Sequence, residues 1–548
     1  MNVGKNIAPR FVTGGLAIFA VLLLLSFAAD AYKIDDAYIH FRIAETFAEY
    51  GQPYFNRNEP VMATSSPVWT YFLTLIALSR FPLPETVAVF NAAFTAVGTC
   101  LWTILLVDLQ DETNLWGEGG MALGYVGVMV PSAVGLMETP LAMMLLALSG
   151  ISLRKRRVVG WFLLALAVFT RLELIVFVPL FLGAQVLSRP YGLGKGEVGT
   201  AVLSFMGGAC GVWATWGGLK PNTMTAKQAV YDIAPIQALK SVVFTIIPSS
   251  GPNALSVVVA GALAVLILYG LVRVMRQTEW ALWRVERDLL WAVAVAIGGG
   301  GIACAYVIKA VHLHEWYQPL FVVPAMFSAL YATRYSASFW GVAGILLLLP
   351  AQSLALFSLS ILSPSYLPDK ASSARVQRYL QVGEVLEQTF PKARLMTSEI
   401  GGLGYAFHGK ILDGVGLVTP GALKHHPVKV GRGRASGGVG AIPSGYVAET
   451  VPELIVSYPV FAKDVVNATV AQQYKLLKIP AFSAESRRIL DVEWLWGSNQ
   501  LYVFVYEELA TPRRLERMRR QLGRREGKLS DKNAQVSSTR DESETVSR

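Results

Sequence analysis

The stretch Lys33–Arg42, KIDDAYIHFR, places two adjacent aspartates directly behind an apolar run, LAIFAVLLLLSFAA at residues 16–29. Charged side chains are expensive in or beside hydrocarbon, so this pair needs a reason. A helix N-terminus favours acidic residues, which explains one aspartate readily and the second less so. Two interpretations stay open at this point, a helix start and the edge of a functional site.

The composition around this stretch is that of a polytopic membrane protein. The chain has 548 residues, is 53% hydrophobic and repeats apolar blocks of near-spanning length. We expect about eleven transmembrane helices in residues 1–361 and a retained first helix, not a cleaved signal peptide. The blocks lie near 11–29, 66–80, 86–107, 120–131, 139–153, 157–170, 173–187, 199–219, 253–275, 287–309, 318–333 and 337–361.

The charge pattern indicates sidedness and argues against nucleic acid as a partner. Much of the basic excess behind the net charge of +10 lies in short loops such as 154–157 and in the tail. Short basic loops are typically cytoplasmic, so we expect the remaining loops on the opposite face. The three cysteines fall in apolar blocks, which predicts neither a disulfide framework nor a metal cluster.

A change in composition near residue 362 predicts a second domain. Residues 362–510 should form a small extracytoplasmic α/β domain, with a helix over 373–390. Strands are expected at 393–398, 453–460 and 501–508. Residues 511–548 are basic and then polar, so we expect a disordered tail there.

The first loop, residues 31–65, carries the aspartates and further polar groups. Its spacing predicts a short interfacial helix over 36–49, and TSSP at 64–67 should cap the following helix. A carboxylate near a hydroxyl can act as a general base. Two adjacent carboxylates can also share a divalent cation.

Four further polar patches fall in loops assigned to the same face, in GLMETP, FTRLELIV, LKPNTMTAKQ and KAVHLHEWYQP. Each has a structural alternative: a mutual ion pair, a capped turn or an interfacial aromatic belt. An i, i+2 histidine pair without a clear third ligand predicts no metal site. The functional interpretation depends on the common sidedness of these residues: Glu138, Arg171, Glu173, Asn222, Lys227, His312, His314, Trp316 and Tyr317.

In this order, DDAYIHFR, YFNRNEPVMATSSPVW, GLMETP, TRLE, PNTMTAK and HEWY resemble the motifs of GT-C fold membrane glycosyltransferases. The sequence is most similar to mycobacterial terminal arabinofuranosyltransferases and their bacterial relatives, whose stretches are approximately DDAYISFR, NPGE, TSPLW, GLET, RPEG and PNTFYAK. MTSEIGGLGYAFHGKILDGVGLVTP resembles the C-terminal domain of that family. The resemblance covers about residues 30–420. Arg-Leu-Glu replaces the usual Arg-Pro-Glu, and a histidine replaces a small polar residue, so the sugar is not implied.

The resemblance implies inverting transfer of a sugar from a polyprenyl-phosphate donor to a cell-envelope glycan or glycolipid. It implies a multi-pass bacterial plasma-membrane protein, without a resident cofactor unless Asp35 and Asp36 hold a divalent cation. Asp36 is the preferred base and Asp35 the next candidate. The implied donor-phosphate ligands are Arg42, Arg171, Lys227, His312 and His314. The implied substrate ligands are His40, Trp69, Glu138, Glu173, Asn222, Trp316, Tyr317, Glu399, Tyr405 and Asp413.

Three other functions remain open on the sequence. A protein O-glycosyltransferase or a lipid A-modifying transferase of the same fold would differ only in its acceptor. A transporter or flippase for lipid-linked sugars predicts inverted repeats and broken helices near the bilayer midplane, and the sequence has no evident repeat. A non-catalytic scaffold predicts that function survives the loss of both aspartates.

Overall fold

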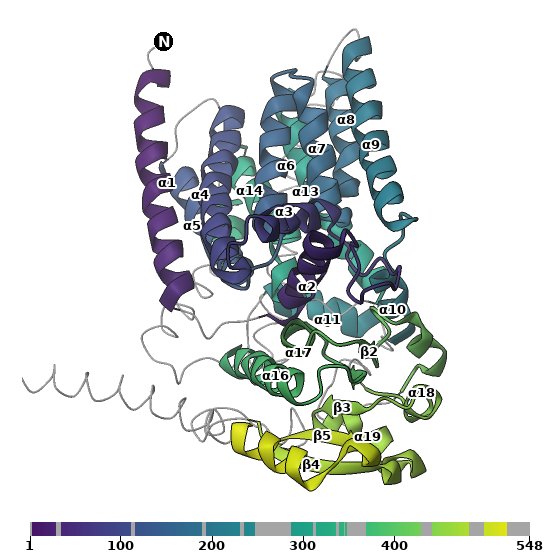
Figure 1. Cartoon of the computed structure of the whole chain (residues 1–548). Coiled ribbons are helices and arrows are strands. Elements are labelled where there is room, and N and C mark those ends of the chain that lie inside the picture. The colour runs from purple at the N-terminus through teal and green to yellow at the C-terminus, as the bar shows by residue number, and fades with distance from the viewer. Residues whose placement is uncertain are drawn as a thin grey trace, which may run out of the picture. The chain divides into compact units, whose positions relative to one another are not determined.

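The computed structural model describes residues 3–28, 34–110, 115–188, 193–230, 235–246, 287–310, 314–335, 339–344, 346–347, 369–428, 441–481 and 498–522 (Figure 1). The chain divides into two compact units. The helical unit contains Met1–Lys33 and Ile43–Pro368, and the C-terminal unit contains Ile34–Arg42 and Asp369–Arg548. A single domain boundary at residue 361 does not account for the DDAYIHFR segment. This segment lies near the start of the chain but belongs to the C-terminal unit.

The helical unit follows the apolar blocks of the sequence. Neighbouring helices pack in pairs, with α4 against α5 and α6, α6 against α7, and α13 against α8 and α14 (Figure 1). The helices are α1 (Val3–Ala28), α3 (Pro67–Leu78), α4 (Leu83–Gln110), α5 (Leu115–Val134), α6 (Thr139–Arg154), α7 (Val159–Thr170), η1 (Leu172–Val176), α8 (Phe177–Leu187), α9 (Lys195–Trp216), α10 (Asn222–Val230), α11 (Pro235–Ile246), α13 (Arg287–Ile308), η3 (Glu315–Tyr317) and α14 (Pro319–Ala332).

Three of the described helices are long and apolar enough to cross a membrane: Leu83–Leu109, Lys195–Trp216 and Asp288–Ile308. Shorter apolar helical segments of 10–17 residues are Val12–Ser26, Pro67–Leu78, Thr139–Arg154, Val159–Thr170, Leu172–Leu187 and Pro319–Ala332. The expected block at 253–275 and most of that at 337–361 lie outside the described residues. The chain is thus a mainly helical protein with membrane-spanning candidates, and the expected number of eleven spans stays a prediction.

The C-terminal unit is built on a five-stranded sheet with the order β2-β1-β3-β5-β4. β1 is parallel to β2 and β3, whereas β5 is antiparallel to β3 and β4. The elements are α16 (Asp369–Thr389), β1 (Leu395–Thr397), α17 (Gly401–Ala406), β2 (Ile411–Asp413), η5 (Pro420–His425), α18 (Ser444–Thr450), β3 (Leu454–Ser457), α19 (Pro459–Asn467), η6 (Thr469–Gln473), β4 (Tyr474–Pro480), β5 (Gln500–Tyr506) and η7 (Glu507–Leu509).

Burial explains which strands the sequence revealed. β1 and β3 are buried along their whole length, as expected for parallel strands covered on both faces. Together with β5 and α16, they confirm the three strands and the helix predicted for this domain. β2 has two apolar residues between Lys410 and its last residue, Asp413, and the edge strand β4 exposes two lysines, so neither was predicted.

The expectation of disorder from residue 511 is wrong for residues 512–522, which are helical. Met518 and Leu522 are buried, and the Gln521 side-chain amide donates to the Gln388 side-chain oxygen at 3.0 Å. Apolar residues within the basic stretch therefore anchor this helix next to α16. Residues 523–548 lie outside the described part of the chain.

Helix α2 (Asp35–Tyr50) confirms the short helix predicted over residues 36–49, but its first half is a buried part of the C-terminal unit. The Asp35 carboxylate accepts the main-chain N–H groups of Gly401 and Gly402, each at 2.9 Å. The Arg42 guanidinium donates to the carbonyl oxygens of Gly404 and Phe407, the latter at 2.6 Å. The segment is thus joined to α17 at both of its ends.

A run of four glycines in α13, Gly298–Gly301, allows close helix packing in the helical unit. A Cβ atom at Gly298 would overlap the Phe177 ring in α8, and one at Gly299 would lie 2.7 Å from Pro324 in α14. A Cβ atom at Gly300 would have no neighbouring heavy atom within 4 Å. The glycines at 298 and 299 therefore serve packing, whereas Gly300 does not.

We predict opposite effects of alanine at these neighbouring sites. Gly298→Ala should overpack α13 against Phe177 and lower stability by about 1–3 kcal/mol. Gly300→Ala is the matched control and should raise stability slightly, since alanine is the better helix former. Melting temperatures of the two variants in one detergent would measure the difference, and equal values would contradict this packing.

Candidate functional site

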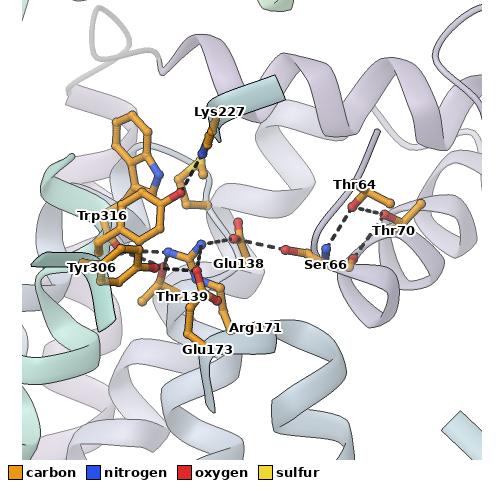
Figure 2. A network of polar contacts seen from close by, with 12 residues as sticks. Thr64, Ser66, Thr70, Glu138, Thr139, Arg171, Glu173, Lys227, Tyr306 and Trp316 are labelled. Atoms are coloured by element: carbon orange, nitrogen blue, oxygen red, sulfur yellow. Dashed lines mark hydrogen bonds and ion pairs between the residues drawn. The ribbon is translucent and has the colours of Figure 1, made fainter. Parts of the chain in front are cut away.

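A buried polar cluster joins the ends of several helices in the helical unit (Figure 2). Glu138 immediately precedes α6, and Arg171 lies between α7 and η1 in extended conformation. Lys227 comes from α10, Tyr306 from α13, and Tyr317 from η3. Sequence positions far apart thus converge where apolar helices begin or end.

Arg171 is the centre of this cluster. Its side chain is 2% exposed, and its Nη1 atom lies 3.0 Å from Oε1 of Glu138, whose side chain is equally buried. The same nitrogen lies 3.8 Å from Oε1 of Glu173, whose side chain is 26% exposed. Nη2 of Arg171 also donates to the Trp316 carbonyl at 3.4 Å. A buried guanidinium needs such partners, because desolvation is otherwise too costly.

Aromatic rings extend the cluster on one side of Arg171. The guanidinium carbon of Arg171 lies 4.4 Å from the centre of the Tyr317 ring, a cation–π contact. Nζ of Lys227 donates to the Tyr317 hydroxyl at 3.1 Å. The Tyr306 hydroxyl donates to Oε1 of Glu173 at 2.6 Å, and its ring packs edge-on to Tyr317 at 5.3 Å. One tyrosine therefore contacts two cations.

Hydroxyl groups extend the cluster on the other side, toward the start of α3 (Figure 2). The Ser66 hydroxyl donates to Oε1 of Glu138 at 3.2 Å. Ser66 is the N-cap residue of α3, but its side chain makes no capping hydrogen bond, which corrects the expected capping role. Pro67 begins the helix, as predicted. The Thr139 hydroxyl donates to the Trp316 carbonyl at 3.0 Å and so joins α6 to η3.

The structure brings together six of the residues selected from the sequence and adds three that sequence reasoning missed. The six are Glu138, Arg171, Glu173, Lys227, Trp316 and Tyr317. The missed residues are Ser66, Thr139 and Tyr306. Ser66 and Thr139 lie within the motifs TSSP and GLMETP and could have been selected from them. Tyr306 lies in an apolar block, where nothing in the sequence marks it as part of a polar site.

Of the remaining selected residues of the helical unit, His314 borders the cluster and Asn222 lies at the start of α10. The His314 and Trp316 rings are stacked, with centroids 4.5 Å apart and planes 3° apart. The main-chain N–H of Asn222 donates to the Met62 carbonyl at 2.8 Å, where α10 starts. His312 lies outside the described residues.

The proposed contact between Trp69 and a sugar is wrong. Trp69 is 0% exposed, and its ring stacks on Phe72 with centroids 5.4 Å apart. Its indole N–H has no hydrogen-bond partner in the described part of the chain. The residue is therefore part of the apolar core beneath α3.

In the C-terminal unit, the selected residues make structural contacts. Glu399 pairs with Arg375 and accepts the Tyr379 hydroxyl at 3.0 Å. The Tyr405 ring packs against Tyr38, with centroids 5.3 Å apart. These contacts hold α16 and the first turns of α2 around α17.

Asp413 is fully buried at the end of β2 and organises the turn that follows. Its carboxylate accepts the main-chain N–H groups of Val415 at 2.8 Å, Val418 at 3.2 Å and Leu417. Burial raises the pKa of Asp413 to about 6, although these main-chain donors work in the opposite direction. A buried carboxylate surrounded by its own turn is not available to cap an acceptor groove, so that expectation is wrong.

The paired aspartates do not fit the divalent cation considered above. Both carboxylate oxygens of Asp35 accept main-chain N–H groups, from Gly401 and Gly402. The positive ends of these N–H dipoles would repel a divalent cation at the same oxygens. Asp36 is half-buried in the first turn of α2, and His40 is buried one turn further on. Across the described ranges, no group of three or more histidine, cysteine, aspartate or glutamate side chains could hold a metal ion.

The Arg42 side chain is also committed to the fold. Besides its contacts with Gly404 and Phe407, its Nη2 atom donates to the Gly409 carbonyl at 2.8 Å, and the residue is 8% exposed. Carbonyl groups at the end of a helix lack partners within the helix, and Arg42 satisfies those that follow α17. This arrangement corrects the expected phosphate role of Arg42 to a structural one.

We predict that Arg171→Ala destabilises the protein by about 3–5 kcal/mol, because Glu138 would keep a buried charge without its cation. Adding Glu138→Gln should recover part of that loss. Arg157→Ala removes an exposed arginine and is the control, with an expected effect within about 0.5 kcal/mol. Melting temperatures in detergent would test this, and wild-type stability of Arg171→Ala would contradict the arrangement.

A second prediction concerns pH. The pKa of Asp413 is about 6 in the fold against an ordinary 3.8, so the folded state binds the proton more tightly than the unfolded state. Its stabilising contribution is full below pH 3.8 and is lost as pH rises through 6, a change of about 3 kcal/mol. Unfolding from pH 4 to 7.5 should show this fall relative to Asp413→Asn, whose side chain does not titrate. Parallel pH profiles of the two proteins would refute it.

Comparison with known proteins finds a match for only part of the chain. Residues 369–504 match a family described as "Domain of unknown function (DUF8728)". No curated protein matches the chain, and neither does any solved structure. The matched segment corresponds to most of the C-terminal unit, without the Ile34–Arg42 segment that completes it.

Proposed function

We propose that this chain is a membrane glycosyltransferase that moves a sugar from a polyprenyl-phosphate donor to a cell-envelope glycan or lipid acceptor. The observation that carries the proposal is the cluster around Arg171, where two cations share one tyrosine at the ends of apolar helices. Such a position suits a ligand with a charged phosphate and a hydrocarbon tail. We also propose that the chain lies in a bacterial plasma membrane, with its C-terminal unit on the extracytoplasmic side. This orientation follows from the basic loops, which are typically cytoplasmic.

Lys227 is proposed to stabilise the leaving phosphate, and Arg171 to hold the tyrosine beside it. Arg171 is buried and balanced by Glu138 and Glu173, so its role is to fix the Tyr317 ring and the local charge. Lys227 is half-buried and reaches the same ring from α10, so it is the better candidate for direct phosphate contact. A phosphodiester gains negative charge as it leaves, and a preorganised cation lowers the energy of that transition state.

Glu173 and Trp316 are the proposed ligands of the sugar. Both side chains are partly exposed, unlike those of Arg171 and Glu138. A carboxylate accepts hydrogen bonds from sugar hydroxyls, and an aromatic ring packs against the C–H face of the sugar. His314 lies parallel to the Trp316 ring and would set the orientation of this aromatic surface.

The proposed reaction is a single displacement with inversion. A carboxylate base accepts the proton of the acceptor hydroxyl while the acceptor oxygen forms a bond to the anomeric carbon. The bond between that carbon and the phosphate oxygen breaks, and its electron pair leaves with the polyprenyl phosphate. The sequence resemblance, and not the cluster around Arg171, is what assigns this base to Asp36. Positioning of the reactants would supply much of the rate, because phosphate is already a good leaving group.

The proposal predicts that Asp36→Asn loses transfer by about 100-fold or more, since a general base contributes on that order. The protein would be purified in detergent and incubated with a panel of synthetic polyprenyl-phosphate sugars and envelope glycan acceptors, with product detected by mass spectrometry. Glu508→Gln, an exposed acid in the C-terminal unit, is the matched control. Wild-type turnover by a correctly folded Asp36→Asn protein would refute the assigned base. Absence of transfer by the wild-type protein across the panel would refute the donor class.

A further inference from the structure

We propose that Asp35 and Arg42 are positioning residues that hold the first two turns of α2 to both ends of α17 and so fix the direction of Asp36. The inference rests on the proposed function, because it gives the two adjacent aspartates different roles in the same reaction. All of the contacts that carry it lie within the C-terminal unit.

The first contact fixes the start of α2. Each carboxylate oxygen of Asp35 accepts one main-chain N–H, from Gly401 and from Gly402, at 2.9 Å. A Cβ atom at Gly401 would overlap the Asp35 carbonyl oxygen, so the main chains approach more closely than any other residue permits. Gly401 in SEIGGLG is thus explained by the approach of Asp35, 366 positions earlier in the sequence, whereas a Cβ atom at Gly402 would meet Val376 of α16.

The second contact fixes the same face of α2 two turns later. Residues seven apart lie on one face of a helix, so Arg42 and Asp35 project from the same side. Arg42 donates to the carbonyls of Gly404, Phe407 and Gly409, at and beyond the end of α17. The anion thus meets the N–H end of α17 and the cation its carbonyl end, which is the favourable arrangement for both charges.

The rings of Tyr38 and Phe41 fill the space between these contacts. Both are buried, and both pack edge-on against Tyr405 of α17, with centroids 5.3 and 6.0 Å away. The segment is therefore held by polar contacts at each end and an apolar contact between them. Asp36 projects about 100° around the helix from Asp35. Whatever fixes Asp35 therefore also fixes the direction of the proposed base.

Two measurements on the full-length protein in detergent test the inference. Hydrogen–deuterium exchange of peptides covering 35–42 and 399–406 reports the contact itself. Transfer from the polyprenyl-phosphate sugar used by the wild-type protein gives kcat and KM. Asp35→Asn, which is isosteric, and Gly401→Ala break the contact without changing Asp36. Gly421→Ala is the matched glycine control, because its Cβ would meet only ordinary contacts at 3.6 Å or more.

We expect faster exchange over residues 399–406 in Asp35→Asn and Gly401→Ala. In both variants kcat should fall about 10- to 100-fold, as for a misplaced catalytic group, with the donor KM within about twofold of wild type. Arg42→Lys keeps the charge but not the fork of donors, so it should show intermediate losses. Asp36→Asn should keep wild-type exchange and lose more activity than any of them.

The outcomes separate this inference from the proposed function. Faster exchange with unchanged kcat would refute the positioning role, and wild-type exchange in Asp35→Asn would refute the contact. A fully active Asp36→Asn protein, or a wild-type protein without transfer, would refute the proposed function while the exchange data still decided the contact. If Gly401→Ala does not fold, the isosteric Asp35→Asn variant alone decides the question.

Discussion

The cost of burying the Arg171 guanidinium determines how the polar groups of the helical unit are arranged. A cation with 2% of its side chain exposed must collect partners, and it takes them from the residue before α6, from η1 and from η3. Because Glu138 also accepts the Ser66 hydroxyl, the start of α3 is bound into the same cluster. Helix ends separated by more than 100 residues are thus fixed by one charge, and its removal would loosen all of them.

The cluster around Arg171 also explains why so much of the candidate site could be predicted. Charged residues inside apolar sequence, such as Glu138 and Arg171, are conspicuous, and the positive-inside rule predicts that their loops lie on one face. Tyr306 could not be selected in this way, since a tyrosine in an apolar block resembles any other core or interface aromatic. Trp69 was selected for its place in a motif, but its full burial follows from packing that the sequence does not encode locally.

For the C-terminal unit, local pattern revealed secondary structure but not the role of the DDAYIHFR segment. The strands β1, β3 and β5 are apolar enough to be recognised, whereas β2 has only two apolar residues and ends on Asp413. Neither hydrophobic period nor charge pattern indicates that Asp35 and Arg42 bind the segment 401–409. The two charges were correctly singled out as unusual, but the reason for them is a long-range main-chain contact.

The contribution of residues 34–42 to the C-terminal unit has a consequence for how the chain folds during synthesis. The contacts of Asp35 and Arg42 join positions 362 to 367 residues apart. At ~5–20 residues per second, the segment waits roughly 20 to 70 seconds for its partners to be translated. Until then the Asp35 carboxylate and the Arg42 guanidinium stay without their native main-chain contacts. A ribosome that stalls, or a truncation that removes α17, therefore leaves an early part of the chain incomplete as well as a late one.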